Sequence, residues 1–134
     1  MALKSKIPRK QRNFLRKGKL HLIKHVIKAP LSPQLREKYH TRSMGLRVGD
    51  LVKIMKGDYK GQTGKIESIQ IKKQIVNISN ITIEKANGSK SKVPFKPSNL
   101  MILELNMSDK WRNKILERKN ANKSPSKKEV AKHE

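Results

Sequence analysis

Hydrophobic and polar positions alternate in two runs near the middle of the chain. In the first run, Val52 and Ile54 lie two positions apart, the period that is typical of a strand. The second run begins at Gly64 and carries Ile66 at the same spacing. Residues 56–61, with the sequence KGDYKG, lie between them and form a turn rich in glycine and charge. Two strands joined by such a turn predict a β-hairpin.

Four further apolar runs predict short strands after this hairpin, and they are residues 75–78, 81–83, 93–95 and 100–105. The Asn87-Gly88 pair before the third of them is a strong hairpin signal. Pro94 and Pro97 predict that this third run is short or lies at a sheet edge. The last run could close a small barrel. We expect the barrel core to contain Val52, Ile54, Ile66, Val76, Ile78, Ile83 and Leu103.

The N-terminal third of the chain has local helix signals instead of strand alternation. Pro8 suits the first turn of a helix, and Gly18 can end it. Four apolar residues then recur at helical spacing until Ala29-Pro30 interrupts them: Leu20, Ile23, Val26 and Ile27. Further on, Ser32 before Pro33 is a hydroxyl N-cap followed by proline, so a short helix should begin there.

A last helix is predicted near the C-terminus. Ser108 or Asp109 can cap it, and it runs to about Arg118. Trp111 and Ile115 are four positions apart and therefore share a face. Because the segment 120–134 has few apolar residues, we expect it to be disordered when unbound.

Charge divides the chain more sharply than hydropathy does. The 134 residues carry a formal net charge of +23, of which +12 falls on residues 1–46, +6 on 47–105 and +5 on 106–134. Such an excess calls for a polyanionic partner, with nucleic acid the first candidate and an acidic membrane surface the second. We therefore expect four segments: a basic N-terminal extension at 1–46, a barrel at 47–105, a helix at 106–119 and a basic tail at 120–134.

Several classes of site are excluded or disfavoured. The chain has no cysteine, no apolar run long enough to span a membrane and no apolar signal segment at its start. Gly64-Lys65 fails the phosphate-loop motif, because Tyr59 and Ile66 occupy positions that need glycine and Ser or Thr. We predict no catalytic residue, no cofactor, no metal, no small-molecule substrate and no membrane partner. His21 and His25 have metal-ligand spacing, but no third ligand is evident.

The hairpin resembles the KOW motif, found in ribosomal proteins and in NusG/Spt5-type elongation factors, through the pattern Gly49-Asp50-x-Val52-x-Ile54-x-x-Gly57-x-x-x-Gly61-x-x-Gly64-Lys65-Ile66. The flanks resemble one family, the universal large-subunit ribosomal protein twenty-four in its archaeal and eukaryotic form, which eukaryotes number twenty-six. They do so in several motifs, among them Pro8-Arg9-Lys10-Gln11-Arg12, Leu31-Ser32-x-x-Leu35-Arg36-Glu37-Lys38-Tyr39, Pro97-Ser98-Asn99-Leu100-Met101-Ile102 and Ile115-Leu116-Glu117-Arg118-Lys119.

This resemblance implies a mainly β fold, a small SH3-like barrel with basic and partly helical extensions. It implies a structural constituent of the large ribosomal subunit that binds the first domain of the large rRNA near the nascent-chain exit and supports subunit assembly and translation. Neighbouring ribosomal proteins would be further partners. The location would be the cytoplasmic ribosome, with nucleolar assembly in a eukaryote. The alternative is a KOW module of an elongation factor that acts on RNA or polymerase.

Lysines, arginines and the glycine-rich turn are the predicted RNA contacts, because cations and backbone N–H groups meet phosphates. They are Arg9, Lys10, Arg12, Arg16, Lys17, Lys19, Arg36, Arg42, Arg47, Lys56, Gly57, Tyr59, Lys60, Gly61 and Lys65. Tyr59 either stacks on an unpaired base or packs on its own barrel. Arg36, Arg42 and Arg47 contact RNA unless they pair with Glu37 or Asp50. Trp111 anchors its helix on the barrel or on rRNA.

Overall fold

Five antiparallel strands form the main sheet in the order β6-β5-β4-β3-β7. The computed structural model describes residues 5–121, and the predicted tail therefore lies almost wholly outside the described residues. The strands are β3 (Leu51–Ile54), β4 (Thr63–Gln70), β5 (Ile75–Glu84), β6 (Lys90–Phe95) and β7 (Leu100–Glu104). Strand β3 lies between β4 and β7, and its Val52 pairs with Gly64 of β4 on one side and with Ile102 of β7 on the other.

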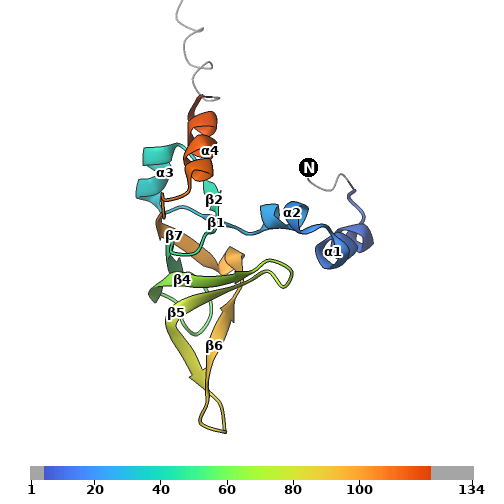
Figure 1. Ribbon diagram of the computed structural model, residues 1–134, viewed down its shortest axis with the longest axis vertical. Coiled ribbons are helices and arrows are strands. Elements are labelled where there is room, and N and C mark those ends of the chain that lie inside the picture. The colour runs from blue at the N-terminus through green and yellow to red at the C-terminus, as the bar shows by residue number, and fades with distance from the viewer. Residues whose placement is uncertain (1–4, 122–134) are drawn as a thin grey trace, which may run out of the picture.

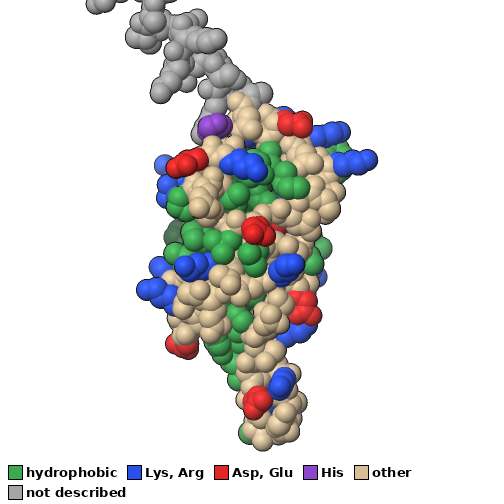
Figure 2. Space-filling view, turned by 90° about the vertical axis from the view of Figure 1, so that its left-hand side faces the viewer, with side chains coloured by type: hydrophobic (Ala, Val, Ile, Leu, Met, Phe, Trp, Pro, Cys, Tyr) green, Lys and Arg blue, Asp and Glu red, His purple; other side chains and the backbone are tan. Residues whose placement is uncertain are grey.

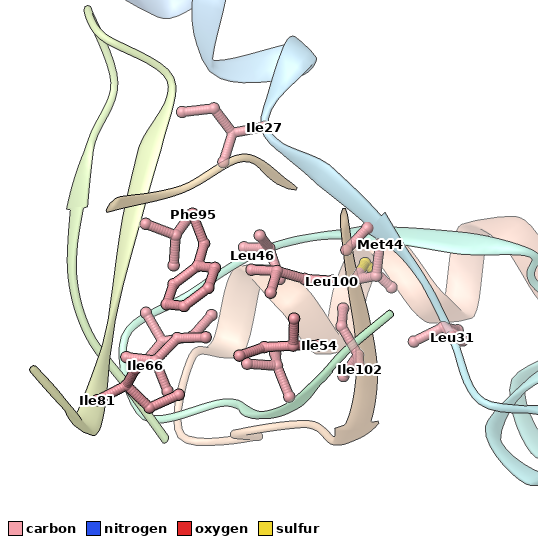
Figure 3. Packing of buried hydrophobic residues seen from close by; sticks show 14 of the residues in the cluster. Ile27, Leu31, Met44, Leu46, Ile54, Ile66, Ile81, Phe95, Leu100 and Ile102 are labelled. Carbon is pink, nitrogen blue, oxygen red and sulfur yellow. The ribbon is translucent and has the colours of Figure 1, made fainter. Parts of the chain in front are cut away.

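The sheet curls so that strands from both of its edges line one core. Figure 3 shows Phe95 of edge strand β6 and Leu100 of edge strand β7 directed into the same cluster as Ile54 and Ile66. Such curling removes apolar area from water, which is the main favourable term in folding. The prediction of a mainly β, barrel-like domain with helical extensions is confirmed.

The expected β-hairpin around the turn at residues 56–61 is present and consists of β3 and β4. Gly57 and Gly61 have φ angles of +96° and +92°, a conformation that L side chains rarely adopt. Gly64 has a different role, because a Cβ there would lie 2.5 Å from Ile78 Cγ2. The glycines thus shape the turn at one point and let two strands approach closely at another.

Two of the strand predictions were wrong in detail. The expected third and fourth strands are one continuous strand, β5, which bends where its register to β6 shifts between Asn77 and Thr82. Asn80 has a φ of +67° within this bend. Beyond it the β5–β6 hairpin extends away from the barrel (Figure 1), so Ile83 is 48% exposed and is not a core residue. Leu103 was also expected in the core but is only half-buried, because Leu100 and Ile102 occupy the inward face of β7.

A two-stranded ribbon, which the sequence pattern did not reveal, covers the barrel. Its strands are β1 (Lys28–Pro30) and β2 (Ser43–Gly45), which pair antiparallel. Leu31, next to this ribbon, bridges to Ile102 of β7. Residues before position 47 therefore add five buried side chains to the core, namely Ile27, Ala29, Leu31, Met44 and Leu46. The division of the chain at residues 46, 105 and 119 stays a prediction.

The helices follow their local signals. They are α1 (Pro8–Lys17), α2 (Leu20–Ile23), α3 (Pro33–Tyr39) and α4 (Lys110–Ala121), with 3-10 turns η1 (Lys24–Val26) and η2 (Pro97–Asn99). Ser32 caps α3 as predicted, since its hydroxyl oxygen accepts a hydrogen bond from the Leu35 N–H at 3.4 Å. Asp109, the second of the two predicted caps, accepts from the Trp111 N–H at 2.9 Å.

Candidate nucleic-acid interface

The first helix, α1, gathers its positive charge on one face. Rotation by about 100° per residue places all five of its basic residues within an arc of about 160°, and these are Arg9, Lys10, Arg12, Arg16 and Lys17. Each of them is exposed, whereas Phe14 and Leu15 on the opposite face are half-buried. The cationic face thus points to solvent and is free to meet a polyanion.

α1 has little support from the barrel. None of its residues is buried, and Figure 1 shows α1 and α2 projecting to one side of the sheet. A helix that is held so loosely and carries so much charge is suited to dock on an external anionic surface.

The segment after α1 joins this arm to the barrel. Lys19 is exposed and precedes α2. Of the predicted apolar stripe, Ile23 and Ile27 are buried, whereas Leu20 and Val26 are 48% and 43% exposed. The stripe divides because the helix ends at η1 and the chain becomes extended at β1. Only half of the stripe therefore anchors the arm.

The β3–β4 loop holds the second group of predicted contacts. Lys56, Lys60 and the β4 residue Lys65 are exposed, as are the two glycines of the loop. Tyr59 is half-buried, and its ring meets the Phe95 ring edge-to-face with centroids 5.9 Å apart. This geometry favours packing on the barrel over base stacking for Tyr59. RNA contact by the lysines stays a prediction.

The three arginines predicted to contact RNA have different surroundings. Arg36 is half-buried on α3 and donates from Nε to the Leu31 carbonyl at 2.7 Å. Arg42 is exposed. Arg47 pairs through its guanidinium with Asp109, at the start of α4. Neither Arg36 nor Arg47 makes its side-chain contact with the carboxylates expected from sequence, Glu37 and Asp50.

Two lysines outside the predicted set join the candidate contacts. The turn between β4 and β5 points toward the side on which α1 and α2 lie (Figure 1). Lys72 and Lys73 lie in this turn and are exposed. Two adjacent lysines at a strand break are a visible signal in the sequence, but only the fold shows that their turn faces the side of the basic helix.

A buried ion pair fixes α4 to the barrel, and sequence reasoning missed it. Arg112, 2% exposed, donates from both terminal nitrogens to Asp50, which is fully buried, at 2.6 and 2.8 Å. Asp50 also accepts from the backbone N–H groups of Arg47 and Asn106. Arg112 donates further to the carbonyls of Gly45 and Asn106. The network ties the ribbon, the barrel and α4 together.

The way α4 packs on the barrel decides between the two predicted roles of Trp111, an anchor on the barrel or a contact with rRNA. Leu116 is 4% exposed and packs in the core, whereas Trp111 is 68% exposed. Trp111 is therefore not an anchor against the barrel, because Arg112 and Leu116 take that place. The contact of Trp111 with rRNA stays a prediction.

Two lysines, Lys119 of α4 and Lys28 of β1, lie near one another where α4 is beside the ribbon. Lys119 donates from its ammonium to the Ser43 carbonyl at 3.3 Å. Partial burial lowers the pKa of Lys119 below its ordinary value of 10.5, and nearby Lys28 lowers it further. An anion placed between these two lysines would relieve their repulsion.

The rest of the surface is more balanced. Figure 2 shows acidic, basic and apolar side chains interspersed on the face seen there, which is the side of the molecule turned away from α1 and α2 in Figure 1. Across residues 5–121, no three His, Cys, Asp or Glu side chains gather as metal ligands. No described helix is long and apolar enough to cross a membrane.

These features define a class of protein, a small antiparallel β-barrel-like domain with a cationic helical arm and a docked C-terminal helix. Residues 5–119 match the family that comprises the eukaryotic ribosomal proteins L26 and their archaeal counterparts, which are numbered twenty-four. The chain is also 39% identical over 119 residues to the large ribosomal subunit protein uL24 of Korarchaeum cryptofilum, covering 89% of this chain and 91% of that relative. The chain therefore belongs to this family of ribosomal proteins, which is not a family of enzymes.

Proposed function

We propose that this protein is a structural constituent of the large ribosomal subunit and binds rRNA. One observation carries the proposal: α1 presents five basic residues on one exposed face and buries none of them. Lysines and arginines there neutralise phosphates where rRNA segments converge, while the barrel fixes their relative placement. Membership of a ribosomal protein family supports the same function.

The finer parts of the proposal concern place and partners. The protein binds the first domain of the large rRNA near the nascent-chain exit, contacts neighbouring large-subunit proteins and supports subunit assembly. It acts in the cytoplasmic ribosome and, if the source is a eukaryote, joins the particle in the nucleolus. The basic arm and the lysines of the β3–β4 loop are its main contacts. The family match favours this function over that of an elongation-factor module.

The salt dependence of RNA binding tests the role of α1. A variant with Arg9→Gln, Arg12→Gln and Arg16→Gln removes three charges from the exposed face of the helix. Each phosphate contact contributes about 0.7–0.9 to the slope of log K against log salt. We therefore expect the slope for a large-subunit rRNA fragment to fall in magnitude by about 2, together with the affinity at low salt.

The matched control removes the same charge from the far end of the β5–β6 hairpin, through Lys85→Gln, Lys90→Gln and Lys92→Gln. Two of these lysines form exposed ion pairs, with Glu84 and Glu67, whose loss should cost little stability. The control should retain nearly the native slope. Equal effects of the two variants, or equal affinity of the native protein for duplex DNA, would show that bulk charge alone explains binding.

A further inference from the structure

Trp111 is the most exposed of the large hydrophobic side chains in the part of the chain that the structure describes. It begins the outward face of α4 and, at helical spacing, shares that face with Lys114 and Arg118. All three side chains are exposed. An indole at 68% exposure has no packing role to explain it, whereas the opposite face of the same helix already holds the anchors.

The surroundings of this indole are cationic and ordered. The Lys114 ammonium lies 5.1 Å from the centroid of the Trp111 ring, a cation–π contact. Arg118 donates from Nε to the Lys114 carbonyl, which holds its guanidinium on the same face. One side of the ring is therefore engaged by a lysine, while the large exposed fraction leaves ring surface open to solvent.

The helix that carries Trp111 is preorganised. The neighbouring Arg112 makes its bidentate pair with buried Asp50, and the Asp109 carboxylate both caps α4 and pairs with Arg47. The Trp111 ring therefore projects from a first helical turn that these contacts fix to the barrel. A contact made from a fixed support loses less conformational entropy on binding than one made from a mobile arm.

We propose that Trp111 stacks on an unpaired base of rRNA, with Lys114 and Arg118 contacting the flanking phosphates. Aromatic rings beside basic side chains are the general means of binding unpaired nucleotides, because every base has a π-face and every linkage a negative charge. The inference rests on the proposed function and adds a second RNA contact on α4. A protein partner fits less well, since two exposed cations flank the ring.

The test uses the fact that the full chain contains one tryptophan, so fluorescence excited at a wavelength that tyrosine does not absorb reports on Trp111 alone. The full-length protein is titrated with an unlabelled large-subunit rRNA fragment and, separately, with heparin, a polyanion without bases. Anisotropy of labelled RNA measures binding in parallel. We expect RNA to quench the emission strongly and heparin to leave it nearly unchanged, because stacking needs a base and neutralisation of lysines does not.

Variants separate stacking from charge. Trp111→Ala should weaken RNA binding about tenfold at fixed salt and leave the salt slope unchanged, and Trp111→Phe should recover most of the loss. The pair Lys114→Gln and Arg118→Gln should instead lower the slope by about 1–2. Circular dichroism should show native structure in all of them, since the altered side chains are exposed.

Three results would overturn the inference. In the first, RNA binding depends on α1, but RNA does not change the Trp111 emission and Trp111→Ala does not change the affinity. This result would reject stacking by Trp111 and leave the proposed function intact. A photoreactive residue at position 111 that cross-links to a neighbouring protein in the assembled subunit assigns the ring to a protein surface. Absence of any RNA binding by anisotropy removes the proposed function itself and this inference with it.

Discussion

Asp50 and Arg112 determine where α4 lies, although they are 62 positions apart in the sequence. Both side chains are almost completely buried, and the carboxylate receives hydrogen bonds from two backbone N–H groups in addition to the guanidinium. A buried ion pair contributes little net stability when it is intact, because both ions lose their hydration. Removing one partner is different, since the other charge is then left buried and unpaired.

Asp50→Asn should therefore destabilise the protein by about 3–5 kcal/mol. The change keeps the shape of the side chain but removes the charge that Arg112 faces. Urea unfolding followed by circular dichroism measures the free energy of unfolding. The matched control is Asp58→Asn in the β3–β4 loop, where the side chain is exposed and the change should stay within about 0.5 kcal/mol. Equal stability of the two variants would contradict this account of the pair.

Sequence reasoning could not find this pair for a physical reason. An arginine in a helix that also carries Lys110, Lys114 and Arg118 looks like one more exposed cation. Only the fold shows that Arg112 faces the barrel. The same limit applies to Ile83, because the strand alternation continues through a bend at which β5 leaves the core.

At the scale of elements, the helices were predictable and part of the sheet was not. Helix starts depend on local signals such as Pro8, Ser32-Pro33 and Asp109, and each of these is present at a helix in the structure. β1 and β2 have three residues each, are separated in the sequence by α3 and are strands only because they pair with one another. So short a segment has no alternation to recognise. The basic composition of α1 could be predicted from the sequence, whereas the outward orientation of Trp111, Lys114 and Arg118 on α4 became apparent only in the fold.

The contact between the ribbon and α4 makes the stability of the protein depend on pH through Lys119. The folded state binds the Lys119 proton less tightly than the unfolded chain does, because burial and Lys28 lower the pKa. The contribution of Lys119 to the free energy of unfolding therefore rises with pH between the lowered pKa and 10.5.

Lys28→Gln should raise the pKa of Lys119 part of the way toward its ordinary value. Recovery is only partial because burial is the larger cause and remains in the variant. NMR titration of ¹³C-labelled lysine measures this pKa directly. Lys90→Gln, in the distant hairpin, is the control and should leave it unchanged. A Lys119 pKa that is insensitive to Lys28→Gln would show that the two charges do not interact.

At the scale of the whole molecule, most of the positive charge and most of the folded sheet lie in different parts of the chain. Residues 47–105 carry +6 and supply all five strands of the main sheet, while residues 1–46 carry +12 and supply the projecting basic helix. A net charge of +23 repels itself in the free protein. Binding to rRNA would neutralise the arm, and the family match agrees with such a partner. We expect the arm to take its final position only on RNA.

Sedimentation of the tagged protein through a sucrose gradient, in moderately high salt and with or without ribonuclease, tests the central claim most directly. If the protein is an integral rRNA-binding constituent, it will migrate with the large ribosomal subunit and leave that position when the RNA is digested. Migration at the top of the gradient, or together with RNA polymerase, would contradict the ribosomal function and favour the elongation-factor alternative.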